Sequence, residues 1–423
     1  MRAARALAAL LVAATAVGPT GPADAADDDP LCVNVSDDVP VSATGESVPL
    51  ELMRVPQVQE IFARHGAQAG AGQNVAVVDS GVAPYGLRIA GSRNFARQSQ
   101  IEDSHGTMVA GLIAGAPRAD GKPVGVAPGA GIVDVRVYDV AAPQDPDQED
   151  AVTSAGVVRG LTWVADHAED LDIGVANVSL WVTPSAALKA VLARLWREDV
   201  VVVAASGNRP GDESDPLWTE FGYGGASERP PGEDAAAAIF PAGYPHVLAV
   251  SASADGAEAV TTDAGEYVLQ STAIDVAAPT YGAVSITANG STCVLDDIAT
   301  SWAAAEVSGV VAMLRSAYPH EDAAQIVARL VHSADGREDR PTVLTGAGVV
   351  RPLEALTRPL DPDRRGEVAQ TSAEPDRHLR ARAPVPSDDL LAPTRDDAVW
   401  WGLLGGGAVL LALVLRPVLA RRR

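Results

Sequence analysis

Three short segments, far apart in the chain, present an aspartate, a histidine and a serine in that order. The segments are VAVVDSG (residues 75–81), HGTMVAG (105–111) and TSWAA (300–304). A serine hydroxyl becomes a good nucleophile when an imidazole takes its proton, and that imidazole needs a carboxylate to fix its tautomer. Asp–His–Ser is one of the chain orders in which such a set occurs. The chain must therefore fold so that Asp79, His105 and Ser301 meet.

Apolar strands alternate with helical patterns along most of the chain. Short apolar runs predict strands at residues 75–78, 131–138, 174–180, 200–204 and 247–251. Helical spacing predicts helices at residues 105–114, 151–166, 186–198 and 300–316. Continuous apolar strands separated by helices are typical of a parallel sheet that is covered on both faces. We expect an α/β fold with three layers, in which helices flank a central, mainly parallel sheet.

The predicted elements place Asp79 and His105 in suitable surroundings. Asp79 ends an apolar strand, where neighbouring backbone N–H groups can keep a carboxylate ionised; a turn-forming aspartate is the alternative. His105 begins a helix in which small residues at 106, 110 and 111 allow close packing against the sheet. The other histidines have no such context. We predict that His105 is the catalytic base and that Asp79 orients it.

Ser301 and Asn208 complete the candidate site. Ser301 opens a predicted helix, whose N-terminus favours negative charge on a tetrahedral intermediate; a plain N-cap serine is the alternative. Asn208 follows a buried strand and a glycine, in VVVAASGN (201–208). Its side-chain amide can donate to a developing oxyanion, although an Asx turn would also suit this position. We predict Ser301 as the nucleophile and Asn208 as the oxyanion donor.

The composition limits the partners of the chain. It has 423 residues and a formal net charge of −23, which argues against nucleic acid as a partner. Hydrophobic residues make up 47% and aromatic residues only 4%, so Ala, Val, Leu and Ile must build the core of one large domain. We find no spacing that is typical of metal ligands, and we expect neither a metal nor a cofactor in the chemistry. No cluster can be assigned to calcium.

The two ends of the chain carry export and membrane signals. Residues 1–25 combine early arginines, an apolar run and a small-residue cleavage site, the pattern of a secretory signal peptide. Residues 398–415 are 18 uncharged, mostly apolar residues, nearly enough to span a ~30 Å hydrocarbon core as a helix. A buried core helix is the alternative, but the arginines of residues 416–423 predict a cytoplasmic tail. We expect a type I, single-pass protein of the cell membrane with its catalytic domain outside the cytoplasm.

Composition divides the rest of the chain into three parts. We predict an acidic N-terminal extension, a catalytic domain and a Pro-, Asp- and Arg-rich linker, at residues 26–53, 54–357 and 358–397. In an exported protein, two cysteines suffice for one disulfide. A Cys32–Cys293 bridge would close a long loop and stabilise the fold by about 4–5 kcal/mol on the chain-entropy model. It would tie the extension beside the loop that carries Ser301.

Further stretches carry a family resemblance. They are GVAPG (125–129), FPAGYPHVLAV (240–250) and IDVAAP (274–279). With the three opening segments, they make the chain resemble the subtilases from about residue 55 to residue 355, and within them the mycosins. The signal peptide, the cysteine-bearing extension and the C-terminal helix with its basic tail fit the mycosin layout. The resemblance implies the subtilisin-like form of the three-layer fold, and a membrane-anchored protease attached to a type VII secretion system.

Two functions from different classes follow. The leading hypothesis is a serine endopeptidase that cleaves exported proteins or peptides through an acyl-enzyme on Ser301, with His105 as base and then acid. The alternative is a low-activity or inactive pseudoprotease that acts as a structural component of a secretion membrane complex. An esterase on the α/β-hydrolase plan fits poorly, because it needs Gly-x-Ser-x-Gly and a Ser–Asp–His order, and Ser301 has neither.

Three departures from the family pattern bear on activity. Ala299 stands where the family usually has a glycine, and its Cβ is expected to crowd a tight turn or the approach of substrate. Glu306, close to where the family proline falls, adds a carboxylate to an apolar helix. Trp181 and Val182 stand in place of Gly-rich substrate-binding backbone and are expected to narrow the pocket. Together these residues predict reduced or very selective activity.

Overall fold

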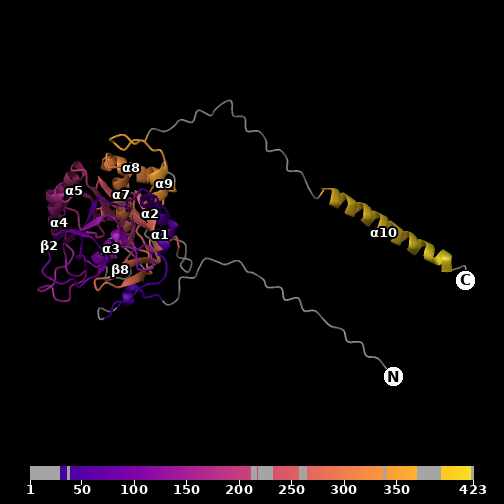
Figure 1. Ribbon diagram of the computed structural model, residues 1–423, viewed down its shortest axis with the longest axis horizontal. Helices are drawn as coiled ribbons and strands as arrows, with labels where there is room; N and C mark the ends of the chain where they lie inside the picture. The colour runs from indigo at the N-terminus through magenta and orange to yellow at the C-terminus, as the bar shows by residue number, and fades with distance from the viewer. Residues whose placement is uncertain are drawn as a thin grey trace, which may run out of the picture. The chain divides into compact units, whose positions relative to one another are not determined.

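The computed structural model describes residues 29–35, 39–210, 217, 232–256, 264–336, 340–368 and 392–420. The chain forms two compact units, residues 1–369 and 370–423, which we describe separately (Figure 1). The predicted signal peptide (1–25), most of the predicted linker and the last three residues lie outside the described residues.

A seven-stranded sheet forms the centre of the first unit. Its strands lie in the order β2-β3-β1-β4-β5-β6-β7, and every neighbouring pair is parallel. Their bounds are β1 (Asn74–Asp79), β2 (Ile89–Asn94), β3 (Gly131–Arg136), β4 (Ile173–Val178), β5 (Val201–Ala205), β6 (Val247–Ser253) and β7 (Val276–Pro279). The parallel sheet is confirmed. The sequence patterns do not predict the two edge strands, because β2 is polar and partly exposed and β7 has only four residues.

Helices cover both faces of the sheet, because successive strand residues point to opposite sides. In β1, Val75 and Val77 join one apolar core, whereas Ala76 and Val78 join the other. Helices α3 and α7 complete the first core, and α4 and α5 complete the second. In Figure 1, α4 and α5 lie on one side of the unit and α1, α2 and α9 on the other. The three-layer α/β fold is confirmed.

The four predicted helices, at residues 105–114, 151–166, 186–198 and 300–316, begin and end close to the expected positions, and further helices occur among the described residues of the first unit. The bounds of the helices are α1 (Val48–Leu52), α2 (Val55–Arg64), α3 (His105–Ala114), α4 (Ser154–His167), α5 (Ala186–Arg197), α7 (Thr300–Ala317), α8 (Ala323–Ser333) and α9 (Pro352–Thr357). Thr153 and Ser185 precede α4 and α5, and each hydroxyl accepts a backbone N–H from three residues further on, at 3.1 Å. Such caps are worth about 1 kcal/mol each and set where the helix starts.

The N-terminal extension pairs with a small second sheet. In that sheet, β8 (Ala283–Ile286) and β9 (Thr292–Leu295) form an antiparallel hairpin. The extension lies along β9: the backbone N–H of Thr292 donates to Val41 O at 3.0 Å, and that of Val294 donates to Pro30 O at 2.9 Å. The extension therefore adds backbone hydrogen bonds to a strand that would otherwise present a free edge.

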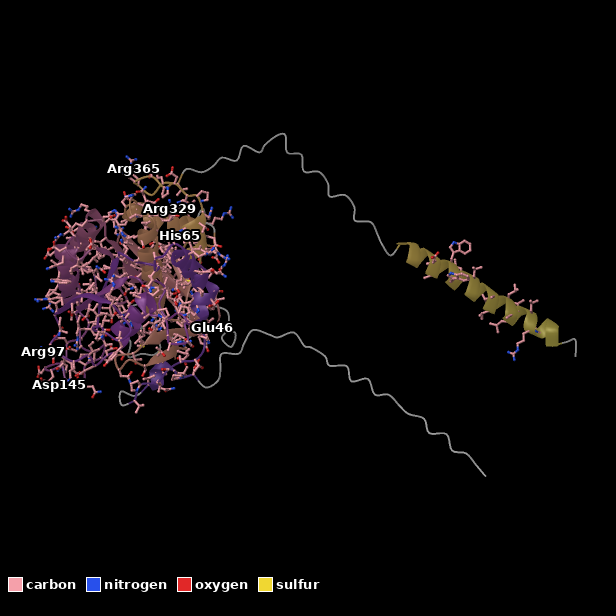
Figure 2. The ribbon with its side chains drawn as sticks, viewed as in Figure 1. Glu46, His65, Arg97, Asp145, Arg329 and Arg365 are labelled. Atoms are coloured by element: carbon pink, nitrogen blue, oxygen red, sulfur yellow. A yellow bond between two sulfur atoms is a disulfide. The ribbon has the colours of Figure 1, made fainter. Side chains whose placement is uncertain are left out.

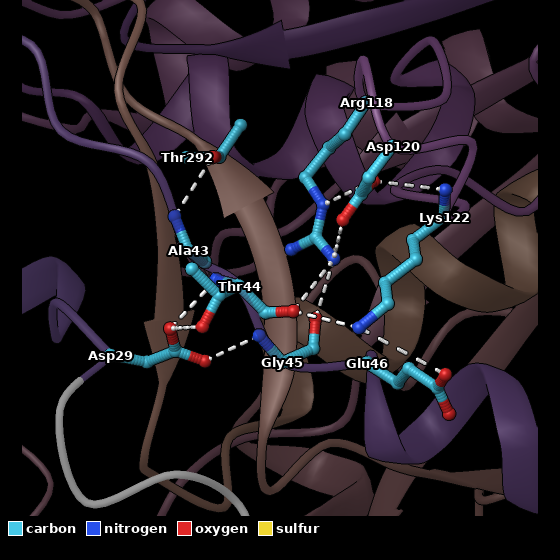
Figure 3. A network of polar contacts seen from close by, with 9 residues as sticks. All are labelled: Asp29, Ala43, Thr44, Gly45, Glu46, Arg118, Asp120, Lys122 and Thr292. Carbon is cyan, nitrogen blue, oxygen red and sulfur yellow. Dashed lines mark hydrogen bonds and ion pairs between the residues drawn. The ribbon is translucent and has the colours of Figure 1, made fainter.

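Polar side chains hold the extension in place at a second point (Figure 3). The Asp29 carboxylate accepts the backbone N–H groups of Thr44 and Gly45, both at 2.6 Å. The Arg118 guanidinium donates to Gly45 O at 2.6 Å, and Lys122 Nζ donates to Thr44 O at 2.8 Å. A short stretch of the extension is thus fixed between one acidic and two basic side chains.

The extension is also joined covalently to the hairpin. Cys32 and Cys293 form the disulfide that the cysteine count predicts. The partner strand β8 packs against α3, where Ser285 Oγ donates to Met108 O at 2.6 Å. The disulfide and the hairpin therefore link the extension to the helix that begins at His105.

Most charged side chains among the described residues of the first unit are not buried. Figure 2 shows Glu46, Arg97 and Asp145 at its periphery, and all three are exposed. The interior instead consists of Ala, Val, Leu and Ile with few aromatic rings, as the composition predicts. Burying small aliphatic side chains in two cores gives a stable body without many rings.

The second unit contains one long helix, α10 (Ala392–Ala420). Within it, the span Asp397–Pro417 has 21 residues; its most apolar 18-residue window has a mean hydropathy of 2.1, and no part of that window is buried. Trp400 and Trp401 are exposed near its start. The helix is long and apolar enough to cross a membrane, and it includes all of the predicted segment 398–415.

Candidate active site

The candidate site lies where the order of the strands changes direction. β1 lies between β3 and β4: the chain places β2 and β3 on one side of β1 and then crosses to place β4 to β7 on the other. In open α/β sheets such a point leaves a crevice at the carboxyl ends of the strands. A cleft of about 890 Å³ is found there, and its lining includes His105, Ser179, Asn208 and Ser301.

Asp79 and His105 are in direct contact. Asp79 is fully buried at the end of β1, and its Oδ1 lies 2.8 Å from Nδ1 of His105. The same oxygen accepts the backbone N–H of Ser80 at 2.8 Å and the hydroxyl of Tyr138 at 3.2 Å. A carboxylate in this position favours the tautomer with hydrogen on Nδ1, which leaves Nε2 free to accept a proton.

The start of α3 fixes His105 tightly against the sheet. The backbone N–H of His105 donates to Asp103 Oδ1, and that of Gly106 donates to Ser80 Oγ, both at 2.9 Å. A Cβ at Gly106 would lie 2.6 Å from the carbonyl oxygen of Gly81. Only glycine therefore allows the helix to approach β1 this closely at residue 106.

The surroundings of His105 favour its protonated form. Burial lowers the pKa of the imidazole, whereas the charge of Asp79 and its hydrogen bond raise it. The charges of Asp103 and Asp297 add to this rise, and the net result is a pKa above the ordinary value of a histidine. The ring of Trp302 lies against the imidazole, with the ring centroids 5.0 Å apart. Carboxylates placed in this way would stabilise the imidazolium if His105 accepted a proton during acyl transfer.

Ser301 is the second residue of α7 and lines the same cleft. Its Oγ donates to the carbonyl oxygen of Ser179 at 3.1 Å, and Ser179 Oγ donates to the carbonyl oxygen of Ser301 at 2.8 Å. Asp79 and His105 are thus hydrogen-bonded to each other, whereas the hydroxyl of Ser301 is directed to Ser179. The sequence patterns give no sign of this pair of contacts.

Asn208 is oriented by the residue that precedes Ser301. Its Oδ1 accepts both the backbone N–H and the hydroxyl of Thr300, at 2.8 and 2.9 Å. Asn208 is exposed and lines the cleft, and its Nδ2 amino group donates to no side chain or backbone group of the described residues. The arrangement can donate to a negatively charged oxygen that forms on a carbonyl attacked by Ser301.

The departures from the family pattern differ in their effects. Ala299 has an extended backbone, with φ −137° and ψ 136°, which any residue adopts, so the expected crowding of a tight turn is absent. Trp181 and Val182 do line the cleft. The backbone N–H of Val182 donates to Phe240 O at 2.8 Å, so a backbone hydrogen bond also holds this segment to the segment around Phe240.

Glu306 is a buried carboxyl in the middle of α7. It is fully buried, and neither side-chain oxygen has a hydrogen-bond partner among the described residues. Burial raises its pKa well above the ordinary value, so the fold favours the neutral, protonated form of the group. The sequence marks this residue as unusual but does not predict that it lacks a partner.

Tyr138 is a site residue that the sequence patterns miss. Its ring is buried, lines the cleft and brings the hydroxyl to Asp79. Burial raises the pKa of this hydroxyl well above its ordinary value, so it stays a donor.

As for metals, no group of three or more His, Cys, Asp or Glu side chains suited to an ion occurs within the described parts of the chain.

Comparison with known proteins identifies the family. The family model described as the subtilase family, peptidase S8, matches residues 70–350. The chain belongs to the subtilase family. This subtilase is accordingly a member of the subtilisin-like serine proteases.

Individual relatives place the subtilase near the mycosins. It is 30% identical to mycosin-4 of Mycobacterium tuberculosis over 385 residues, which cover 84% of this chain and 78% of the relative. Over 340 residues, it is also 30% identical to the M-protease of Shouchella clausii, covering 79% and 76% of the two chains. The solved structure of the MycP3 protease from the type VII (ESX-3) secretion system matches with a TM-score of 0.57 and 29% identity, covering 78% of this chain and 91% of that one.

Proposed function

We propose that this subtilase is a membrane-anchored endopeptidase that cleaves peptide bonds of exported proteins. The carrying observation is the 2.8 Å contact between Asp79 Oδ1 and His105 Nδ1 in the cleft that Ser301 and Asn208 also line. A carboxylate, an imidazole, a hydroxyl and a carboxamide donor are the groups that acyl transfer needs. Asp79, His105 and Ser301 form the triad in this proposal.

In the proposed reaction, Ser301 Oγ turns from Ser179 O towards Nε2 of His105. His105 takes the hydroxyl proton as Oγ bonds to the peptide carbonyl carbon, and the oxygen that becomes negative accepts from Nδ2 of Asn208. The charge of Asp79 stabilises the imidazolium, which then protonates the leaving amine. A water molecule, deprotonated by His105, hydrolyses the acyl-enzyme and restores Ser301.

The proposal also fixes the topology of the chain. Residues 1–25 act as a signal peptide, the tract 358–397 is the linker, and the helix that includes Asp397–Pro417 anchors the protein. The arginines of residues 416–423 keep the tail in the cytoplasm. The similarity to MycP3, from a type VII secretion system, supports a secretion complex of the same type as the partner.

One observation favours a second function. The hydroxyl of Ser301 is hydrogen-bonded to Ser179 O and not to His105. If that contact persists with substrate present, the protein is a pseudoprotease that acts as a structural part of the secretion complex.

A fluorophosphonate probe separates the two functions, because it labels only a serine that a neighbouring base activates. We expect the folded full chain in detergent to be labelled at Ser301. Ser301→Ala should abolish the label and Asp79→Asn should slow it strongly, while both variants keep the circular dichroism of the parent. A folded parent protein that stays unlabelled would exclude the protease function and leave the pseudoprotease as the remaining candidate.

A further inference from the structure

The cleft contains an acidic side chain that the proposed reaction does not use. Asp103 lies two residues before His105, is half-buried and lines the cleft. No lysine or arginine belongs to the described lining of the cleft. The imidazole of His105 is the one lining side chain there that can become positively charged. The described wall of the cleft therefore offers a negative charge and no permanent positive one.

The carboxylate of Asp103 has a single hydrogen-bond partner among the described residues. Its Oδ1 accepts the backbone N–H of His105 at 2.9 Å, which holds the side chain in place. Within the described part of the chain, Oδ2 receives no hydrogen bond and Asp103 forms no ion pair with a lysine or arginine. One carboxylate oxygen is thus left for a donor from outside the protein.

Neighbouring charges strengthen the negative potential. Asp79 and Asp297 act on the same imidazole as Asp103, and together they raise its pKa in spite of burial. The guanidinium of Arg136 could oppose them, but it lies 2.7 Å from Asp139, and both side chains are buried. Charges in a cleft with low-dielectric walls act more strongly on a ligand than charges on an open surface.

We propose that the cleft binds peptides that place a lysine or arginine side chain beside Asp103. Met108 and Tyr138 line the same cleft and offer apolar surface for the methylene groups of such a side chain. The free Oδ2 of Asp103 accepts its charged N–H group. This inference names the substrate class of the proposed protease and so rests on that function for its catalytic meaning, but the binding that it predicts does not require turnover.

Binding to the full-chain Ser301→Ala protein in detergent tests the proposal. The probes are Ala/Gly decapeptides that carry one arginine at each position in turn, and matched peptides with uncharged citrulline in its place. At one position, we expect the arginine peptide to bind about tenfold tighter than its citrulline partner, the scale of a partly screened charge pair in a cleft. The preference should shrink as salt is raised.

Two substitutions of adjacent acids make the test specific. Asp103→Asn keeps an oxygen for the N–H of His105 and removes the charge, so it should abolish the arginine preference and leave citrulline binding unchanged. Glu102→Gln removes the same charge one residue earlier, from an exposed side chain outside the cleft lining, and should leave the preference intact. Equal weakening of both peptides by Asp103→Asn, or equal affinity of the parent protein for both, would overturn the proposal.

A second readout needs no peptide. Removing the charge of Asp103 should lower the pKa of His105, against which Asp79 and Asp297 still act. The pH dependence of fluorophosphonate labelling in the Ser301 protein should shift to lower pH in Asp103→Asn and not in Glu102→Gln. A labelled enzyme without an arginine preference refutes the inference alone, whereas an unlabelled protein with the preference refutes only the catalytic function.

Discussion

Ser301 and Ser179 exchange hydrogen bonds across the cleft. Ser301 Oγ donates to Ser179 O at 3.1 Å, and Ser179 Oγ donates to Ser301 O at 2.8 Å. Ser179 follows the end of β4, and Ser301 lies in the first turn of α7. The pair therefore ties the helix that carries the proposed nucleophile to the carboxyl end of a central strand.

Ser179→Ala should weaken this connection. The Ser179 hydroxyl also lies 3.1 Å from Asn177 Oδ1, so its loss removes the single O–H donor that Ser301 O and Asn177 Oδ1 share. We expect the free energy of unfolding to fall by about 1–3 kcal/mol and labelling of Ser301 to slow. Thermal unfolding and the labelling rate measure the two effects. Parent-like values for both would contradict a supporting role for Ser179.

Tyr138→Phe should change the pH profile of the reaction. The hydroxyl of Tyr138 donates to Asp79 Oδ1 at 3.2 Å. This hydrogen bond weakens the electrostatic effect of the carboxylate on His105. Without it, Asp79 favours the imidazolium of His105 more strongly, so the acid limb of the labelling profile should move to higher pH by roughly half a unit. Phenylalanine keeps the ring in its pocket. An unshifted limb would mean that the hydroxyl is not coupled to His105.

Asn208→Asp should separate the oxyanion role from the structural role. Aspartate keeps an oxygen for the two donors of Thr300 but removes the Nδ2 donor. We expect kcat on a peptide substrate to fall by about 10²–10³-fold, with the melting temperature nearly unchanged. Asn208→Ala removes both functions and should also lower the melting temperature. A kcat close to that of the parent would exclude Asn208 as the oxyanion donor.

Glu306→Gln should make stability less dependent on pH. Burial raises the pKa of Glu306 in the folded protein. Below about pH 4.3 the carboxyl is protonated in both states; above it, only the unfolded chain loses the proton, and stability falls by about 1.4 kcal/mol per pH unit until the folded pKa is reached. The glutamine variant lacks this loss.

Thermal unfolding between pH 4 and pH 8 measures the effect. The melting temperature of Glu306→Gln relative to the parent should rise with pH until the folded pKa of Glu306 is reached, and the value at pH 4 is the internal control for the change of side chain. A variant that becomes less stable than the parent as pH rises would show that Glu306 is ionised and paired in the folded state.

The sequence alone predicted the fold class of the protein and the residues of its candidate triad. Apolar strands of four to eight residues separated by helical spacing are local patterns, so the parallel three-layer fold follows from them. The segments around Asp79, His105 and Ser301 identified the candidate triad for the same reason, since each combines a reactive residue with the small residues that its element needs. The edge strand β2 was not predicted from the sequence, because its polar, partly exposed residues resemble those of a loop.

The tertiary structure decided how these residues are held. The contact of Tyr138 with Asp79 joins residues 59 apart in the chain, and that of Ser301 with Ser179 joins residues 122 apart. No local pattern encodes such distances, because they depend on which strand ends meet at the edge of the sheet. The absence of strain at Ala299 and the missing partner of Glu306 depend in the same way on backbone angles and neighbours that only the packed fold supplies.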